Sequence, residues 1–346
     1  MSAWKKVKRS NFVIKLASWE YWPFGILQLP LFFYWMWLSM KARSLVFFSA
    51  SNPGIDMGGM FGESKFSVLQ KVPKQYVPRT VLATLPITSE DVIKLMADNG
   101  LNFPVIFKPD LGERGHLVKK ILAEADIAPY LRQIKVDFLI QDLVDLPLEF
   151  GVFYERFPDS ARGEVTSVVM KEMLSVTGDG VSTLKDLILN FDRAKLQWNK
   201  LREAYDSQLD EILPEGKRME LVSIGNHALG TKFLDGSRLM NERLSKTFDN
   251  ISRQIEGFYF GRYDLRCSST EDLYTGNVVV MELNGCGAEP AHIYEPGFPL
   301  TKAIGVLFRH WRNLYLISAQ NRRRGVRYIS LREAYRFYKK FKHATT

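Results

Sequence analysis

The sequence predicts an α+β fold, from three observations. Its expected strands follow one another along the chain, as antiparallel strands do, at 150–154 and 165–170. Helical segments lie among the strands without the regular alternation that a doubly wound parallel sheet requires. Of the 346 residues, 46% are hydrophobic and 25% are charged, which is typical of a globular chain and excludes disorder as its main state. At this length, one large core or two to three smaller lobes are expected.

The individual elements are predicted from hydrophobic patterns and from the residues that begin and end helices. An apolar run at 45–50 ends at an Asn-Pro-Gly turn signal. Thr88 begins a helix that closes at Asn99, and Ser182 is the expected cap of another. The other predicted elements are strands at 104–107, 138–141, 150–154, 165–170 and 278–283, and helices at 183–189, 192–213 and 239–255.

The formal charge of +9 is divided unevenly along the chain. Residues 1–43 hold seven Lys or Arg and one acid, for +6, and residues 309–346 hold eleven and one, for +10. The stretch 44–308 is therefore −7. A nucleic-acid-binding protein more often carries basic residues across its folded domain. Basic ends beside apolar and aromatic segments point instead to an anionic membrane surface, and nucleic acid is not an expected partner.

The aromatic segment 19–40 is interpreted as lying in a membrane interface. It lacks the small-residue cleavage site of a signal peptide. As a membrane span it is interrupted by Pro23, Gly25, Gln28 and Pro30, and its longest clean stretch, 31–38, is far below the roughly 20 residues that a span needs. Its Trp and Tyr residues suit the headgroup boundary. The alternative is an aromatic helix packed on the body of the protein or on a second subunit.

The carboxyl-terminal segment predicts a basic amphipathic helix. Ser330 and Glu333 have the spacing of a capping box. Such a helix is typical of membrane-surface binding or of a partner helix, and a helix packed on the body is the alternative. The expected apolar stripe consists of Leu331, Tyr335, Tyr338 and Phe341.

Two clusters predict contacts with phosphate and with a metal ion. Lys108 ends a strand and is followed by a loop with Gly112 and Gly115, a combination suited to an anion because backbone N–H groups can approach it closely. In the strand at 278–283, Glu282 and Asn284 point to the same face, and with Asp264 they offer the oxygen ligands that Mg²⁺ prefers. A polar strand edge with ordinary surface acids is the alternative for this second cluster.

A third cluster, between two predicted strands, fits the base and sugar of a nucleotide. The segment 141–144 can offer backbone groups to an adenine edge, and Glu149 can accept hydrogen bonds from ribose hydroxyls. This cluster is the least specific of the three taken alone. Order and spacing of all three clusters are more informative than any single one.

Taken together, the clusters resemble the ATP-grasp superfamily of carboxylate–amine ligases, in an arrangement similar to D-alanine–D-alanine ligase and cyanophycin synthetase. The resemblance covers residues 58–300, and the Gly-Asp-Gly-Val-Ser-Thr stretch at 178–183 is its most specific match. It implies an ATP-grasp fold, in which two α+β lobes clasp ATP. The segments expected are a basic aromatic segment at 1–50, a small lobe at 51–141, a large lobe with the metal site at 142–308 and a basic tail at 309–346.

The resemblance also implies a role for each group. Gln141 stands where the family more often has Glu, and Glu149 lies one residue later than usual. The catalytic residues implied are Arg262, Lys171 and Asn226, and the metal ligands are Asp264, Glu282 and Asn284. The ATP-binding residues implied are Lys65, Lys108, Gly112, Arg114, Gly115, Gln141, Asp142, Leu143, Val144, Glu149 and Lys171.

The function expected from this resemblance is an ATP- and Mg²⁺-dependent ligase, with Mn²⁺ as a possible substitute. A carboxylate and an amine, small or lipid-like, are joined through an acyl-phosphate. Such ligases usually have a preceding substrate domain, for which the about 50 residues before Gly54 are too few. Because a basic aromatic segment stands there instead, the expected substrate is hydrophobic or membrane-borne.

Two other functions remain open at this point. One is a phosphotransferase on the same fold, and the other is a non-catalytic, membrane-tethered nucleotide-binding module. The two cysteines are too few for a disulfide framework and fit a reducing compartment, and Cys286 is interpreted as a packing residue. The expected location is therefore cytoplasmic, peripheral on the inner face of the cell membrane. A homodimer is left open.

Overall fold

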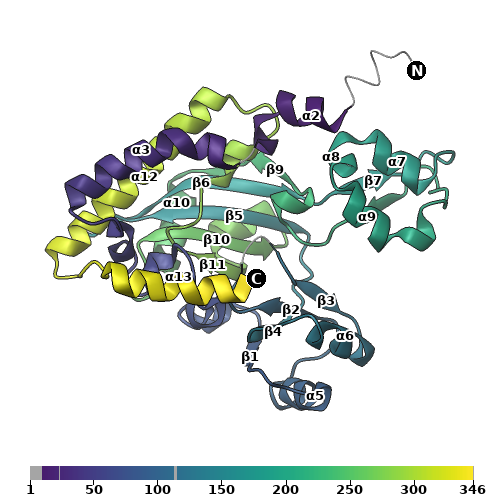
Figure 1. Cartoon of the computed structure of the whole chain (residues 1–346), viewed down its shortest axis with the longest axis horizontal. Coiled ribbons are helices and arrows are strands. Elements are labelled where there is room, and N and C mark those ends of the chain that lie inside the picture. The colour runs from purple at the N-terminus through teal and green to yellow at the C-terminus, as the bar shows by residue number, and fades with distance from the viewer. Residues whose placement is uncertain (1–9, 23, 113–114, 346) are drawn as a thin grey trace.

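The computed structural model describes residues 10–22, 24–112 and 115–345, and its largest element is a five-stranded sheet (Figure 1). Every neighbouring pair in this sheet is antiparallel, so the predicted α+β class is confirmed. The strands predicted at 150–154 and 165–170 do pair with each other. The order across the sheet is β11 (Val279–Asn284), β10 (Phe260–Cys267), β5 (Leu148–Glu155), β6 (Glu164–Glu172) and β9 (Lys232–Asp235).

A second, smaller lobe has its own sheet of four strands. Their order is β1 (Thr80–Ala83), β4 (Phe138–Asp142), β2 (Val105–Pro109) and β3 (Lys119–Ile121). The helices α5 (Ser89–Asp98) and α6 (Ile127–Leu131) contribute to this lobe, and the predicted start of α5 is confirmed by a capping box between Thr88 and Asp91. Its core is a separate aromatic cluster in which the ring centroids of Phe107 and Tyr130 lie 5.2 Å apart.

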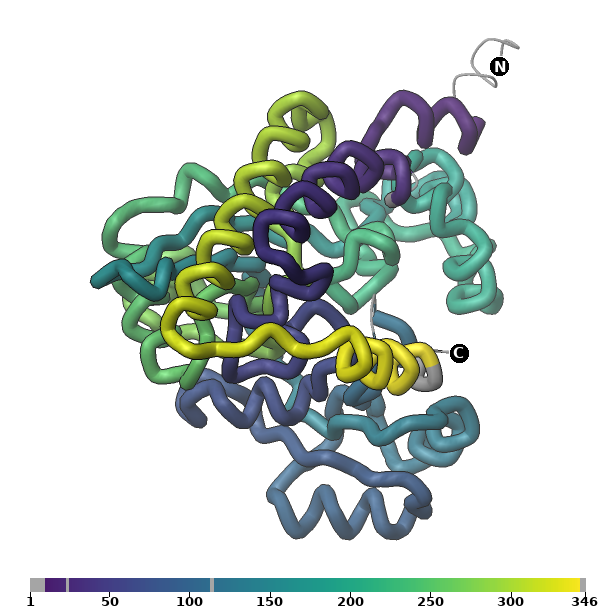
Figure 2. Tube along the Cα trace, turned by 60° about the vertical axis from the view of Figure 1, so that its left-hand side comes forward, coloured from purple at the N-terminus to yellow at the C-terminus, as the bar shows by residue number. Residues whose placement is uncertain are grey.

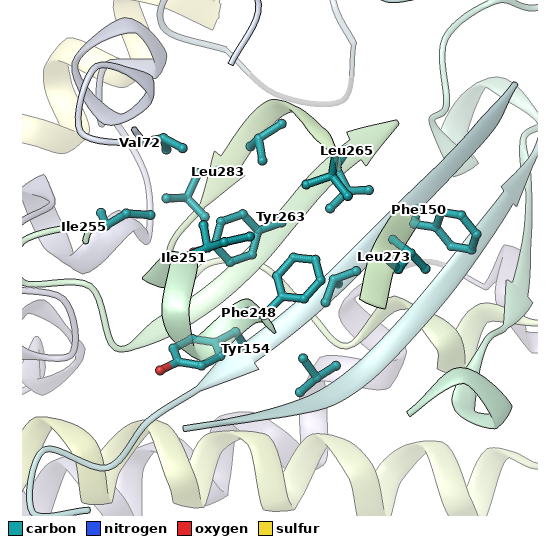
Figure 3. Close-up of a cluster of buried hydrophobic side chains, with 14 of the residues drawn as sticks. Val72, Phe150, Tyr154, Phe248, Ile251, Ile255, Tyr263, Leu265, Leu273 and Leu283 are labelled. Carbon is teal, nitrogen blue, oxygen red and sulfur yellow. The ribbon is translucent and has the colours of Figure 1, made fainter. Parts of the chain in front are cut away.

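The large sheet is covered on both faces. Figure 3 shows the core on one face, where Phe248 of α10 (Glu242–Ser252) packs against Tyr263 and Tyr154. Complete burial of such a side chain stabilises the fold by about 1.5–3 kcal/mol. Because side chains alternate along a strand, Phe153 points to the opposite face, where it meets His310 of α12 (Leu300–Arg323). Helix α11 (Thr270–Thr275) adds Leu273 to the first core.

The segment 175–220 forms a small subdomain beside the sheet. It contains β7 (Ser175–Thr177) paired with β8 (Arg218–Glu220), and α7 (Leu184–Asn190) begins one residue later than predicted because Thr183 is its cap. The single helix predicted at 192–213 is wrong. The chain forms α8 (Asp192–Lys195) and α9 (Trp198–Ala204) and then bends, which brings Leu201 and Leu213 into one core that a straight helix would hold apart.

The amino-terminal segment lies on the large lobe. After α2 (Asn11–Ala17), the helix α3 (Phe24–Ala42) runs beside α12, as Figures 1 and 2 both show. Interruption at Gly25, Gln28 and Pro30 was expected, but these residues lie within the helix, where Pro30 is on the exposed side. Pro23 falls outside the described residues. Among the helices that the structure describes, none is long and apolar enough to cross a membrane.

The carboxyl-terminal helix α13 (Leu331–Thr345) begins as predicted, because the Ser330 hydroxyl and the Glu333 carboxylate bond reciprocally at its first turn. The predicted apolar stripe is wrong in part. Leu331 and Tyr335 are exposed and Tyr338 is 49% exposed with its ring beside Phe61, whereas Phe341 contacts Phe61 as a packed member of the stripe would. Ala334 and Phe337, which are not in the predicted stripe, also face the body.

The remaining described elements are short. The helix α4 (Lys65–Leu69) precedes both sheets in the chain and contacts β1 of the small sheet and β11 of the large one. The 3₁₀ turns are Trp19–Tyr21, Phe47–Ala50, Asp56–Gly59, Lys74–Tyr76, Glu124–Asp126, Asp206–Gln208, His227–Leu229, Ser237–Leu239 and Ala291–Tyr294.

Candidate active site

A cavity of about 990 Å³ lies between the two sheets and receives side chains from both. It is lined by every sequence-predicted site residue in the described part of the chain, whereas Arg114 falls outside that part. The predicted residues that line it are Lys65, Lys108, Gly112, Gly115, Gln141, Asp142, Leu143, Val144, Glu149, Lys171, Asn226, Arg262, Asp264, Glu282 and Asn284.

The centre of the cavity is built by the pairing of β10 with β11. Their register places Asp264 opposite Glu282 and Arg262 opposite Asn284, so four polar side chains meet on one face. Asp264 Oδ2 accepts from Asn284 Nδ2 at 2.8 Å and from an Arg262 guanidinium nitrogen at 3.1 Å. Its other oxygen, Oδ1, lies 3.1 Å from Lys171 Nζ. Asp264 thus holds two cations and an amide at a single point.

Electrostatics keep both carboxylates of this centre ionised. Burial alone would raise the pKa of Asp264, but Arg262 and Lys171 outweigh it and hold the pKa far below its usual range. Burial likewise opposes the charge of Glu282, whose pKa is nevertheless lowered by Lys65 and Lys108. Lys65 and Glu282 form a direct ion pair. An ionised pair facing each other across two strands is a suitable donor set for a divalent cation.

The donor set of Asp264, Glu282 and Asn284 meets the requirements of Mg²⁺. Two carboxylates and one amide oxygen leave positions for phosphate oxygens, which is how Mg²⁺ commonly binds a nucleotide in proteins. Within the described residues no group of three or more His, Cys, Asp and Glu side chains could hold a metal. The predicted trio contains only two such side chains, because its third member is Asn284. The residues present therefore fit a Mg²⁺ ion that is shared with a nucleotide.

Lys108 reaches the cavity from β2 of the small lobe. Its Nζ lies 3.0 Å from Gln141 Oε1 and 3.0 Å from the main-chain oxygen of Met281, so it spans the two lobes. Burial lowers the pKa of Lys108 to about 8, an effect that the nearby Glu282 opposes. A lysine desolvated in this way gains charge stabilisation when an anion such as phosphate binds beside it.

Glu149 is more constrained than its predicted ribose contact requires. One of its oxygens accepts from Lys171 Nζ at 3.0 Å, and the other lies 2.9 Å from Arg266. Arg266 also donates to the main-chain oxygen of Val144, which fixes the segment 141–144 beside the cavity. The sequence interpretation missed Arg266, although it follows Asp264 by two residues and therefore shares its face of β10.

The predicted Asn226 loop also lines the cavity, where the preceding Gly225 lies against Glu149 and Lys171. Asn226 caps the short turn that follows, where its Oδ1 accepts from the backbone N–H of Ala228 at 2.8 Å. Gly115 approaches this loop with a left-handed φ of 70°, and a Cβ there would lie 3.4 Å from the Asn226 amide. The glycine loop of the small lobe and the asparagine loop of the large lobe are therefore neighbours.

The terminal segments also line the cavity, which the sequence interpretation missed. Trp22 and Leu27 come from the amino-terminal segment and Phe341 from α13. Glu20 is held in the wall by Arg193, at 2.8 Å, and by His227 Nε2, at 2.9 Å. No local pattern marks these residues as neighbours, because Glu20 lies 207 positions from His227 and Phe341 lies 280 positions from Phe61.

Neither a protein-family model nor a curated protein matches this chain. Solved structures do match it, and three of them illustrate the similarity. These are the VanG D-Ala:D-Ser ligase from Enterococcus faecalis (14% identity, TM-score 0.42, 75% of this chain), a D-alanine–D-alanine ligase from Bacillus anthracis complexed with ATP (13%, 0.39, 75%) and a bifunctional glutathione synthetase from Pasteurella multocida (18%, 0.38, 70%). The matched region covers 64% of the VanG ligase, 66% of the D-alanine–D-alanine ligase and 35% of the glutathione synthetase. This chain therefore spans less than two thirds of the length of two of these proteins and about two thirds of the third.

Proposed function

We propose that this protein is an ATP-dependent carboxylate–amine ligase of the ATP-grasp type. The observation that carries the proposal is the single cavity in which Lys108, Lys171 and Arg262 surround the ionised pair Asp264 and Glu282. Cations suited to phosphate and carboxylates suited to a metal occur together there, as phosphoryl transfer requires.

The reaction proposed has two steps. A substrate carboxylate oxygen attacks the γ-phosphorus of ATP, the bond to the bridging oxygen breaks, and ADP leaves. The amine, after losing its ammonium proton to water, then attacks the acyl carbon through its nitrogen, the C–O bond to phosphate breaks, and phosphate leaves with the second proton that the nitrogen gives up. Lys108 and Lys171 bind phosphate oxygens, and Arg262 stabilises charge on the transferred group. Mg²⁺, or Mn²⁺ in its place, held by Asp264, Glu282 and Asn284, supplies further positive charge to the phosphates.

The proposed function predicts that ADP release by the full-length chain depends on a carboxylate and an amine together. ADP is measured with a panel of carboxylates, and hydroxylamine is used as a general amine that converts an acyl-phosphate to a hydroxamate. A hydroxamate together with ADP is the expected result. A stable phosphorylated product that forms equally without amine would identify a phosphotransferase. ATP binding without turnover would identify a non-catalytic module.

We further propose that the enzyme works at the inner face of the cell membrane on a hydrophobic or membrane-borne substrate. Lys41 is the one charged residue of α3, and the outward side of this helix is apolar, with Phe33 and Met40 63% and 68% exposed. A helix that is apolar all round but covered on one side suits an apolar phase on the other. The exposed apolar residues of this side are Ile26, Leu29, Phe33, Met36, Trp37 and Met40.

Charge supports an anionic bilayer as the phase that α3 contacts. Helix α12 runs beside α3, with the rings of Tyr34 and Phe308 4.8 Å apart, and it exposes Lys302, Arg309 and Arg312. Each basic side chain near an anionic cytoplasmic leaflet contributes about 1 kcal/mol of attraction. Apolar and basic side chains on neighbouring helices thus match the two layers of a membrane interface.

Vesicle binding is expected to depend on this side of α3. The full chain should sediment with vesicles of phosphatidylcholine and phosphatidylglycerol, and Phe33→Ser with Trp37→Ser should weaken binding about tenfold or more, because two large apolar side chains no longer enter the interface. Val181→Ser is the matched control, since Val181 is 78% exposed elsewhere on the surface. Equal sedimentation of the double variant and the parent would contradict the proposal.

A further inference from the structure

The end of the cavity beyond Arg262 is built largely by residues that the two reaction steps leave unused. Glu289 lines it, in the loop that follows β11. The main-chain oxygen of Glu289 accepts from an Arg262 guanidinium nitrogen at 3.2 Å. The main chain of Glu289 is therefore fixed beside Arg262, the residue that the proposed reaction places at the transferred group.

The partners of the Glu289 carboxylate are neutral in the part of the chain that the structure describes. One oxygen accepts from Gln28 Nε2 at 2.9 Å, and the other accepts from the Tyr294 hydroxyl. Arg262 contacts the main-chain oxygen of Glu289 and forms its ion pair with Asp264. Neutral donors orient a carboxylate without forming an ion pair with it, and the charge of Arg262 acts on Glu289 from beside its main-chain oxygen.

The other acids near this end differ from Glu289 because they are already paired with cations. Glu20 is bound by Arg193, and Asp264 by Lys171 and Arg262. Aromatic and apolar side chains also line the cavity, among them Trp22, Leu27 and Phe233. Aromatic faces and a carboxylate that forms no ion pair among the described residues favour an organic cation over an anion or a neutral group.

We infer that Glu289, Gln28 and Tyr294 form the binding site for the ammonium group of the amine substrate, with an apolar or aromatic portion of that substrate against Trp22 and Leu27. This inference rests on the proposed ligase function and names the class of its second substrate. It also gives the amino-terminal segment a place in substrate recognition, because Trp22, Leu27 and Gln28 all belong to it. Trp19 fastens the same segment by donating its Nε1 hydrogen to the main-chain oxygen of Phe298.

The test uses phenethylamine, an ammonium on an aromatic group, and its neutral analogue phenethyl alcohol. Binding of each to the full chain is measured by calorimetry, with and without a non-hydrolysable ATP analogue and Mg²⁺. Phenethylamine should bind more tightly than the alcohol, and Glu289→Gln should weaken the amine about tenfold or more while leaving the alcohol unchanged. Glu295→Gln, in the same loop region but outside the cavity wall, is the matched control.

A second variant separates recognition from folding. Trp22→Ala should weaken phenethylamine about fivefold through the loss of its aromatic face, and thermal unfolding shows whether each variant is folded. Equal affinity of amine and alcohol, or an unchanged amine affinity in folded Glu289→Gln, overturns the inference. The ligase proposal can fail separately. If the ATP analogue does not bind but amine binding still depends on Glu289, the ligase proposal is overturned and the ammonium site is retained.

Discussion

Replacing Asp264 by Asn is expected to reduce ATP turnover by about three orders of magnitude. Asp264 is the point where Lys171, Arg262 and Asn284 converge, and it lies opposite Glu282 in the register of the two strands. The amide keeps the shape of the side chain but removes the charge that would hold a metal and orient both cations. Unpaired cations at a buried site are also costly, so the folded state should lose about 3–5 kcal/mol.

Turnover and stability have to be measured on the same preparations to separate these two effects. ADP release is followed at saturating ATP, and unfolding in urea gives the change in stability. Asp249→Asn is the matched control, because Asp249 is also buried and paired, with Tyr154 and Arg253, but lies outside the cavity. It should lose stability while each folded molecule keeps its turnover. Turnover by Asp264→Asn within tenfold of the parent would refute the proposed role.

Replacing Arg193 by Met is expected to destabilise the folded chain by about 3–5 kcal/mol and to release the segment 10–22 from the large lobe. The side chains of Arg193 and Glu20 are only 7% and 5% exposed, so the carboxylate would remain buried with His227 as its partner. Replacing both residues, Arg193 by Met and Glu20 by Gln, should recover much of the loss because no unpaired charge remains.

The pH dependence of the free energy of unfolding provides a second test of the ion pair between Arg193 and Glu20. Burial opposes ionisation of Glu20, but His227 and Arg193 together lower its pKa below the ordinary 4.5. A lowered carboxyl pKa contributes stability above pH 4.5 that is lost as the pH falls through the folded-state pKa. Arg193→Met should lose much of this acid-side dependence.

Hydrogen exchange of the segment 10–22 is the direct measurement of its release. Arg327→Met, which breaks an ion pair whose arginine side chain is 76% exposed, is the control and should cost below about 1 kcal/mol. Unchanged exchange of the segment in Arg193→Met would show that Arg193 does not anchor it.

The residues at the centre of the cavity were predictable because they lie close together in the sequence or share one face of a strand. Alternation by two places Glu282 and Asn284 on one face of β11, and it places Arg262 and Asp264 on one face of β10. The structure brings these groups into one cavity, while the roles given to them remain proposals. The same alternation would have added Arg266, which was overlooked.

What the sequence could not predict depends on contacts between distant segments. Tyr335 is exposed because α13 docks on Phe61 through Tyr338 and Phe341, a contact that no helical period can reveal. The bend after α9 follows from a core that closes around Leu201 and Leu213. Glu20 enters the cavity wall only because Arg193 and His227 are folded beside it.

The small lobe has a hydrophobic core of its own, separate from the cores of the large sheet and of the subdomain at 175–220. Parts of a protein unfold together when they bury their apolar side chains against one another, and these three cores consist of different residues. Lys108, whose Nζ donates to the main-chain oxygen of Met281, directly links the small lobe to the large sheet. Unfolding should therefore proceed in more than one transition, and a nucleotide gripped by both lobes would draw those transitions together.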